Sequence, residues 1–159
     1  MKKFLMGLCL CFALVGCQAK PNYTRNTEMG VVVTMTFDEA MEKMENKETF
    51  MFAFTQTTCG GCLWFKENIL SGYIKNHGFD FNEVSIDKEK NPQKIIDFVA
   101  ENPNPEKFLP EGYEPTDVLT PTFYFVEDGE IKDIFVGTDI TEKDFDQLIQ
   151  KYKLDEVKE

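Results

Sequence analysis

The residues with the clearest chemical potential are Cys59 and Cys62, which flank two glycines. They follow an apolar run over 49–55, which is typical of a strand covered on both faces, and they open a helix predicted to continue over about 63–76. At such a junction the first cysteine lies at the helix N-terminus, where unpaired amides and the helix dipole favour a thiolate. The second cysteine follows one turn later, within reach of a disulfide. The pattern predicts redox chemistry.

Two other uses of these cysteines compete with redox chemistry. A zinc site needs more ligands than Cys59, Cys62 and the single histidine, His77, can supply. A purely structural disulfide would close a loop too short to remove much chain entropy. The acid-rich stretch 133–146 is predicted as a solvated face rather than a metal site, and His77 as a residue near solvent at a helix end. We therefore predict neither a metal nor a cofactor.

The first seventeen residues predict export. Lys2 and Lys3 precede an apolar run over 4–15 that is too short to span a bilayer, for which about 20 residues are needed. The run ends in Leu-Val-Gly-Cys17. This ending resembles the lipobox of bacterial lipoproteins, in which the cysteine is lipidated and becomes the first residue of the mature chain. The alternative is an ordinary secretory signal that a cysteine happens to follow.

Composition and charge limit the remaining functions. The 159 residues suffice for one domain, and 42% hydrophobic content is ample for a core. A net charge of −11 argues against nucleic acid and against electrostatic binding to an anionic membrane. Removing the signal leaves only Cys59 and Cys62 as thiols, since Cys17 is committed to lipid. Contact with the lipid bilayer is thus expected through Cys17 alone.

The chain beyond the signal alternates strands and helices and is assigned to the α/β class. A capping box at Thr36 to Glu39 opens the first helix, and Asp128-Gly129 is a strong hairpin signal. Strands are predicted over 31–35, 49–55, 79–86, 121–127 and 130–136, and helices over 36–46, 63–76, 92–101 and 141–152. The boundaries are a signal peptide over 1–16, a polar tether over 17–30, a domain over 31–153 with an exposed insertion at about 102–116, and a tail over 154–159.

Residues 31–153 resemble the thioredoxin superfamily. Besides the two cysteines, the resemblance rests on Val-Ser-Ile-Asp87, on Thr120-Pro121-Thr122 and on the hairpin with its Val-Gly137 ending. It implies a thioredoxin-like three-layer α/β/α sandwich with a mixed central sheet, a C-terminal β-hairpin and a closing helix. In the family the proline is cis and faces the cysteines, and its predecessor contacts substrate.

The resemblance therefore implies that Thr120 and Pro121 bind substrate, unless Pro121 is an ordinary strand-opening proline. Trp64 and Phe65 lie just inside the cysteine helix, where one must face the core and the other can line the substrate surface; Trp64 is the predicted substrate contact. Thr58 stands where thioredoxin has tryptophan, so this surface differs from that of thioredoxin.

Two further departures concern proton transfer. Thioredoxins have a buried aspartate six residues before the first cysteine and a lysine on the neighbouring strand, whereas this chain has Ala53 and Glu83. Glu83 is predicted on the same face as Phe81. The resemblance to the family implies that this position lies beneath the cysteines, where a carboxyl suits general acid–base work on Cys62. In the alternative, strand twist directs Glu83 to solvent, where it has no role.

Together these features predict an extracytoplasmic thiol-disulfide oxidoreductase, lipid-anchored to the bacterial cell membrane and acting on protein disulfides. Cys59 attacks and Cys62 resolves the mixed disulfide. The predicted partners are exported protein thiols and disulfides and a membrane redox partner. The alternative is a non-catalytic accessory or binding lipoprotein. Such a protein would fit the chain's similarity to thiol-disulfide proteins of bacteriocin export in Gram-positive bacteria. The direction of the reaction depends on a reduction potential that the sequence does not contain.

Overall fold

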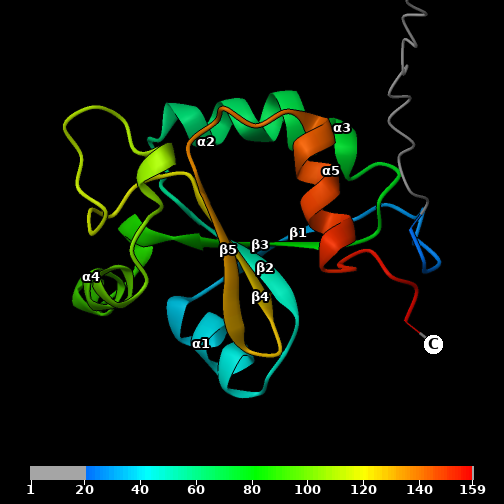
Figure 1. Cartoon of the computed structure of the whole chain (residues 1–159), viewed down its shortest axis with the longest axis horizontal. Helices are drawn as coiled ribbons and strands as arrows, with labels where there is room; N and C mark the ends of the chain where they lie inside the picture. The colour runs from blue at the N-terminus through cyan, green and yellow to red at the C-terminus, as the bar shows by residue number, and fades with distance from the viewer. Residues whose placement is uncertain (1–20, 159) are drawn as a thin grey trace, which may run out of the picture.

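A five-stranded mixed sheet forms the centre of the computed structural model, which describes residues 21–158 (Figure 1). The strand order is β1-β3-β2-β4-β5; β1, β3 and β2 are parallel, while β4 runs antiparallel to β2 and β5 antiparallel to β4. The strands are β1 (Val31–Met35), β2 (Phe50–Thr55), β3 (Asp80–Ser85), β4 (Thr122–Glu127) and β5 (Glu130–Val136). The predicted signal peptide and Cys17 lie outside the described residues.

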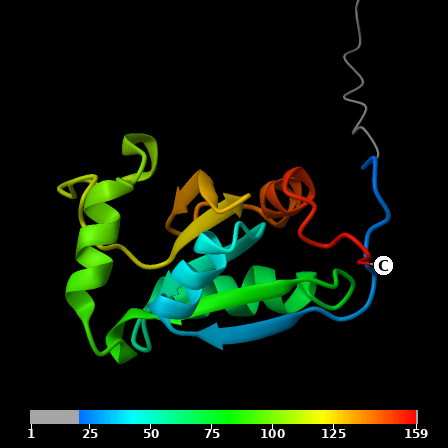
Figure 2. The same ribbon diagram turned by 90° about the horizontal axis from the view of Figure 1, so that it is seen from below.

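Helices cover both faces of the sheet and make the three layers that the sequence predicts (Figure 2). One face packs against α1 (Phe37–Glu45) and α4 (Pro92–Glu101). The other packs against the cysteine helix and against α5 (Glu142–Lys151). Within residues 21–158, no helix is long and apolar enough to cross a membrane.

The central strand β2 contributes side chains to both layers of the core. Phe50, Phe52 and Phe54 face α1 and α4, whereas Met51 and Ala53 face the cysteine helix. All six residues of β2 are buried, which explains why the strand is a continuous apolar run. Truncating a fully buried phenylalanine here is expected to cost about 3–5 kcal/mol. Because β2 is packed on both faces, it fixes the position from which the chain enters the cysteine turn.

The cysteine helix differs from its predicted limits. It begins at Gly60, three residues early, because Cys59 itself caps the helix. It is also divided into α2 (Gly60–Phe65), a π-helical turn η1 (Lys66–Leu70) and a short α3 (Ser71–Tyr73), and so ends before Asn76. By contrast, the capping box between Thr36 and Glu39 is present as predicted.

The predicted tether and tail are corrected by contacts at the two ends of the described chain. Arg25 and Glu156 form an antiparallel bridge, and the Arg25 guanidinium binds the buried carboxylate of Asp155. Residues 23–30 are therefore part of the folded domain, and so are residues 155–157. Sequence patterns missed this because the partners lie 130 positions apart.

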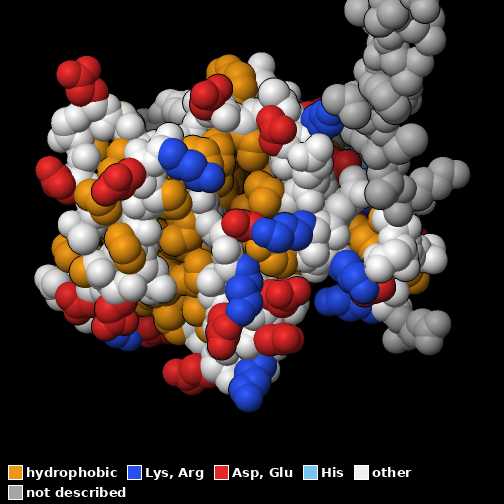
Figure 3. All heavy atoms as spheres, viewed as in Figure 1, with side chains coloured by type: hydrophobic (Ala, Val, Ile, Leu, Met, Phe, Trp, Pro, Cys, Tyr) orange, Lys and Arg blue, Asp and Glu red, His pale blue; other side chains and the backbone are white. Residues whose placement is uncertain are grey.

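The predicted insertion is attached to the domain at two points rather than fully exposed. Asn104 is buried and donates hydrogen bonds to the carbonyls of Pro115 and Asp117, which closes the base of the segment. Phe108, in the short helix η3 (Glu106–Phe108), packs on Phe135 of β5 with ring centroids 4.7 Å apart. On the face seen in Figure 3, hydrophobic side chains gather over α4, this segment and β5, beside a groove of about 430 Å³.

Candidate active site

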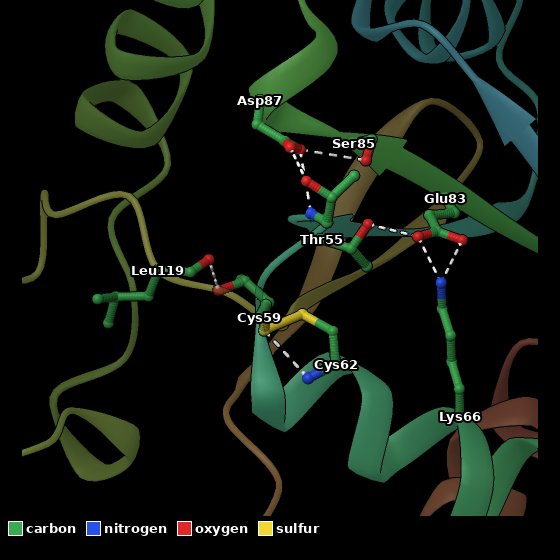
Figure 4. Close-up of a disulfide and its surroundings, with 10 residues drawn as sticks. Thr55, Cys59, Cys62, Lys66, Glu83, Ser85, Asp87 and Leu119 are labelled. Atoms are coloured by element: carbon green, nitrogen blue, oxygen red, sulfur yellow. Dashed lines mark hydrogen bonds and ion pairs between the residues drawn. A yellow bond between two sulfur atoms is a disulfide. The ribbon is translucent and has the colours of Figure 1, made fainter.

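Cys59 and Cys62 form a disulfide at the N-terminus of α2, with their Cα atoms 5.3 Å apart (Figure 4). Three residues separate Cys59 from β2, so the strand places the cysteine at the edge of the sheet. The Cys59 sulfur accepts a hydrogen bond from the Cys62 backbone N–H at 3.0 Å, as a capping group does. Cys59 is half-buried, whereas Cys62 is only 3% exposed. A partner sulfur can thus approach Cys59 but not Cys62.

The loop before Cys59 is held by the end of β3. The Asp87 carboxylate accepts hydrogen bonds from the backbone N–H of Thr57, at 3.2 Å, and from its hydroxyl. Ser85 also donates its hydroxyl to Asp87, at 3.3 Å (Figure 4). The Thr57 hydroxyl holds the pKa of the Asp87 carboxyl below its ordinary value, so this anchor stays ionised near neutrality. Sequence analysis noted Asp87 only as part of a motif.

Pro121 packs beside the disulfide and forms what we call the proline wall. The peptide bond between Thr120 and Pro121 is cis, as the resemblance implies. Pro121 is buried and its carbonyl accepts a hydrogen bond from the Gly137 N–H at 2.8 Å. The Thr122 hydroxyl donates to the Leu119 carbonyl, also at 2.8 Å, which fixes the approach to the proline. Thr120 remains half-exposed next to this wall.

The two glycines between the cysteines have different surroundings. A Cβ atom on Gly61 would lie 3.3 Å from Cδ of Pro121 and 3.2 Å from Cγ2 of Thr138, closer than ordinary van der Waals contact. A Cβ atom on Gly60 would meet nothing within 4 Å. Gly61 therefore allows the proline wall to approach the cysteine turn, while Gly60 faces open space.

A carboxylate cluster, made of Glu83, Lys66 and Thr55, lies behind the disulfide. The Lys66 ammonium donates to both Glu83 oxygens at 2.6 and 2.7 Å, and the Thr55 hydroxyl donates to one of them at 2.6 Å. Glu83 is the register partner of Ala53, so its carboxylate stands on the strand beside the position where thioredoxins have aspartate. Lys66 and Thr55 were missed, although Lys66 follows Cys62 by one helical turn and so shares its face.

A cavity of about 270 Å³ joins the carboxylate cluster to Cys62. Its lining includes Cys62, Lys66 and Glu83, together with Thr34, Gln56, Thr57, Leu63, Ser85 and Lys88. The volume is large enough for water, and the lining offers donors and acceptors on several sides. The arrangement can therefore carry a proton between the buried sulfur and the Glu83 carboxylate.

The two aromatic residues that follow Cys62 have opposite positions. Phe65 is 1% exposed and packs on Phe123, Phe81 and Phe145. Trp64 is 44% exposed on the outer side of α2, next to the exposed Leu63. The exposed tryptophan leaves an apolar surface two residues beyond Cys62.

His77 and two acids of the acid-rich stretch, Asp133 and Asp146, make their contacts outside the cysteine site. His77 is half-buried and stacks on Tyr73, with ring centroids 3.9 Å apart. Asp146 accepts hydrogen bonds from Arg25 and Tyr73, while Asp133 binds Lys151 and Tyr152. Over the described part of the chain, no group of three or more His, Cys, Asp or Glu residues could hold a metal ion.

Comparison with known proteins identifies the fold. No family model matches the chain, and no curated protein sequence matches it. Among solved structures, a thioredoxin from Malassezia sympodialis is 18% identical with a TM-score of 0.51, over 76% of this chain and 92% of that one. The chain has the thioredoxin fold. Thioredoxin O1 from Arabidopsis thaliana, in the oxidised state, is 22% identical over 76% and 96% of the two chains, with a TM-score of 0.48. A Plasmodium falciparum thioredoxin is 21% identical over 76% and 98%, also at 0.48. The predicted fold class is confirmed.

Proposed function

We propose that this protein is a thiol-disulfide oxidoreductase that acts on exported proteins from a lipid anchor at Cys17. One observation carries the redox assignment: a half-buried Cys59 caps a helix and is bonded to a buried Cys62, with a carboxylate behind the pair. A disulfide needed only for stability requires neither the difference in exposure nor the cavity. The thioredoxin fold agrees with this chemistry.

Exchange proceeds through a mixed disulfide. In the reduced protein the Cys59 thiolate attacks one sulfur of a substrate disulfide; a Cys59–substrate bond forms and the other substrate sulfur leaves as a thiolate. Cys62, as a thiolate, then attacks the Cys59 sulfur, which restores the Cys59–Cys62 disulfide and releases the second substrate thiolate. Two electrons pass to the substrate, and the reverse sequence oxidises a substrate dithiol. The reduction potential selects the direction.

Glu83 is proposed to handle the proton of Cys62. The buried thiol must lose its proton before it can attack, and regain one when the disulfide is reduced again. The carboxylate of Glu83 borders the same cavity as Cys62, so water in that cavity can connect the two groups. Lys66 and Thr55 occupy fixed donor positions on that carboxylate and orient it. Glu83 thus acts as the general base, and Lys66 is a positioning residue.

Substrate contact is proposed at the surface around Cys59. Thr120 is half-exposed beside the cis proline, and Trp64 is exposed two residues past Cys62. An extended substrate segment could lie along Thr120 and Pro121 while an apolar side chain rests on Trp64. Trp64→Ala is expected to raise KM for a protein disulfide but not for a small disulfide.

The proposed location depends on the sequence before residue 21. A lipidated Cys17 would keep the domain at the outer surface of the bacterial cell membrane, where a membrane redox partner would recycle the cysteines. Cys17→Ala is expected to move the protein from the membrane to the soluble fraction. If the variant stays with the membrane, the anchor lies elsewhere.

The decisive experiment is catalysed insulin reduction together with refolding of scrambled ribonuclease. The protein should accelerate at least one of them, and Cys59→Ser should remove the acceleration. A measured reduction potential of the Cys59–Cys62 pair would then assign the direction. An unaltered protein that accelerates neither reaction would favour the accessory or binding lipoprotein.

A further inference from the structure

Cys59 is preceded by a short turn, residues 56–58, which we call the entry turn. The side chains of Gln56, Thr57 and Thr58 are all exposed, so packing does little to fix their conformation. Within this turn the N–H of Cys59 donates to the Gln56 carbonyl at 3.1 Å. The position of Cys59 therefore depends on the hydrogen bonds that hold the entry turn.

Asp87 ties the entry turn to the sheet. It lies in the short helix η2 (Ile86–Lys88), which directly follows β3. Its carboxylate accepts the Thr57 N–H at 3.2 Å, the Thr57 hydroxyl, and the hydroxyl of the buried Ser85 at 3.3 Å (Figure 4). We call Asp87, Thr57 and Ser85 the Asp87 brace. Because hydrogen bonds to a carboxylate are stronger than those between neutral groups, one residue fixes both the main chain and the side chain of Thr57.

The Asp87 brace borders both cysteines. Thr57 precedes Cys59 by two residues, and its partner Asp87 lies 30 positions later in the chain. Thr57 and Ser85 also line the cavity that Cys62 borders. A change in the brace is therefore transmitted to the cysteine pair by a single turn of chain.

The brace matters most when the disulfide is open. In the oxidised protein the S–S bond itself holds Cys59 beside Cys62, with their Cα atoms 5.3 Å apart. Reduction removes that bond, and Cys59 is then held by the helix cap that it forms and by the entry turn. A more confined Cys59 gives a higher effective concentration of one sulfur at the other, which favours closure of the disulfide.

We propose that Asp87 is a positioning residue that makes the Cys59–Cys62 pair more strongly reducing, because its hold on Thr57 keeps Cys59 near Cys62 after reduction. The proposal rests on the redox function proposed above and adds a determinant of its reduction potential. In equilibrium with glutathione, the protein dithiol and one glutathione disulfide give the protein disulfide and two glutathione thiols. Two electrons and two protons pass from the protein to glutathione. Asp87 acts through Thr57 and exchanges neither.

The test measures that equilibrium. The chain from residue 17 onward, with Cys17→Ala so that Cys59 and Cys62 are its only thiols, is equilibrated in glutathione buffers of known ratio. After an acid quench, alkylation and mass spectrometry give the oxidised fraction. Asp87→Ala should lower the equilibrium constant for oxidation about fivefold, which makes the reduction potential about 20 mV less negative at about 30 mV for each tenfold change.

Two further variants separate the hydrogen bonds of Asp87 from its charge. Thr57→Val removes the hydroxyl donor, keeps the shape of the side chain and changes no charge, and should lower the constant about threefold. Asp87→Asn removes the charge but keeps an oxygen that can accept from Thr57, so its constant should lie between those of Asp87→Ala and the unaltered chain.

Two exposed residues outside the brace provide matched controls. Thr116→Val repeats the threonine substitution in the segment between α4 and β4, and Asp97→Ala removes an acid on α4. Both should leave the equilibrium constant unchanged.

Unfolding distinguishes this role from a purely structural one. A purely structural residue would lower the stability of the oxidised and reduced proteins equally and leave the equilibrium constant unchanged, because the constant reflects the difference between the two folded forms. Loss of the brace should instead lower the free energy of unfolding more in the oxidised protein than in the reduced one. Urea unfolding of both forms measures this.

Constants for Asp87→Ala and Thr57→Val that are raised, or lie within about twofold of the unaltered chain, would overturn the proposal. An equal fall in Asp87→Asn and Asp87→Ala, with Thr57→Val unchanged, would assign the effect to charge and overturn it as well. Failure of the redox function is a different result. In that case the unaltered chain would accelerate neither insulin reduction nor ribonuclease refolding, whatever the potentials of the variants.

Discussion

At the end of the sheet where β2 stops, the chain presents a half-buried disulfide, a cavity and one carboxylate held by two donors. At the opposite end, Arg25 binds two carboxylates and a phenol around a completely buried Asp155. Both ends contain acids, a base and hydroxyls. The first leaves a sulfur accessible, whereas the second buries one carboxylate, that of Asp155, completely and leaves Arg25 and Asp146 only partly exposed.

This difference indicates that the cysteine end of the domain serves reactivity and the Arg25 end serves stability. Glu83, the proposed proton carrier, borders a cavity and keeps 12% of its side chain exposed, so its carboxylate can exchange protons with water. A structural ion pair is strongest when water is excluded and every polar atom has a partner. Variants at the first end should therefore alter rates with little effect on stability, and variants at the second end should do the opposite.

The largest effect is expected at the cysteines. In the reduced protein, iodoacetamide near neutral pH should label Cys59 first, because Cys62 is buried. Cys62→Ser should accumulate a mixed disulfide with substrate, and Cys59→Ser should not. Mass spectrometry of the alkylated and trapped species measures both results. Preferential labelling of Cys62 would mean that the two roles are reversed.

The next effect is expected at the carboxylate cluster. Glu83→Gln keeps the shape of the side chain but removes its proton chemistry, and should slow catalysed exchange about 10²-fold with a changed pH profile. Lys66→Met should give a smaller loss. Glu67→Gln, on the exposed side of the cysteine helix, is the matched control. An unchanged rate and pH profile for Glu83→Gln would show that water, and not Glu83, transfers the proton of Cys62.

Breaking the terminal clamp, in which residues 23–26 bind residues 155–157, should lower the free energy of unfolding without slowing exchange. Arg25→Ala leaves the buried Asp155 charge without its main partner and should lower the free energy of unfolding by about 3 kcal/mol. Lys43→Ala removes an exposed ion pair with Glu48 and should cost at most about 1 kcal/mol. Urea unfolding of the oxidised proteins gives both values. Similar losses in the two variants would contradict the contrast between the ends.

Acid should open the clamp before it affects the disulfide. Burial tends to raise the pKa of Asp146, but hydrogen bonds from Arg25 and Tyr73 outweigh it and hold that pKa below the ordinary value of 3.8. A lowered pKa adds stability above pH 3.8 that is lost as pH falls through the folded-state value. The urea midpoint should therefore fall more steeply below pH 4 in the unaltered protein than in Arg25→Ala. Parallel curves of urea midpoint against pH in the two proteins would show that Asp146 does not contribute to the pH dependence of stability.

The smallest expected effect is a difference in stability between alanine substitutions at Gly60 and at Gly61. Gly60→Ala should stabilise the folded protein by about 0.5–1 kcal/mol, because alanine favours a helix and its methyl group meets open space. Gly61→Ala should gain less or lose stability, because its methyl group presses on Pro121 and Thr138. Thermal unfolding of the two oxidised variants compares them directly. A larger gain in stability for Gly61→Ala would show that Pro121 moves aside to accommodate the methyl group.

The sequence predicted what neighbouring residues determine. The capping box at Thr36 to Glu39 and the turn at Asp128-Gly129 act within four residues, and both elements form as expected. The continuous apolar run of β2 likewise predicted burial on both faces. These signals were sufficient for the fold class and for the place of the cysteines.

Contacts between distant segments escaped the sequence analysis. Lys66 meets Glu83 across 17 positions, and Arg25 meets Asp155 across 130, so no local pattern marks either pair. The π-helical turn at Lys66–Leu70 also lacks a recognisable signal, and the helix was predicted as unbroken. The Lys66–Glu83 and Arg25–Asp155 pairs form only when the sheet and its helices have packed together. A single sequence does not reveal that packing.

The central place of β2 in the sheet also determines when the chain can fold during synthesis. Phe54 pairs with Val84, about 30 residues later, while Phe52 pairs with Tyr124, about 70 residues later. Such non-local pairing delays folding, since long loops must close before their contacts form. The sheet cannot be completed until β4 has emerged, and Arg25 must wait for Asp155, near the end of the chain. Until then the fold does not shield Cys62, so a nascent chain would itself be a substrate for the proposed oxidoreductase.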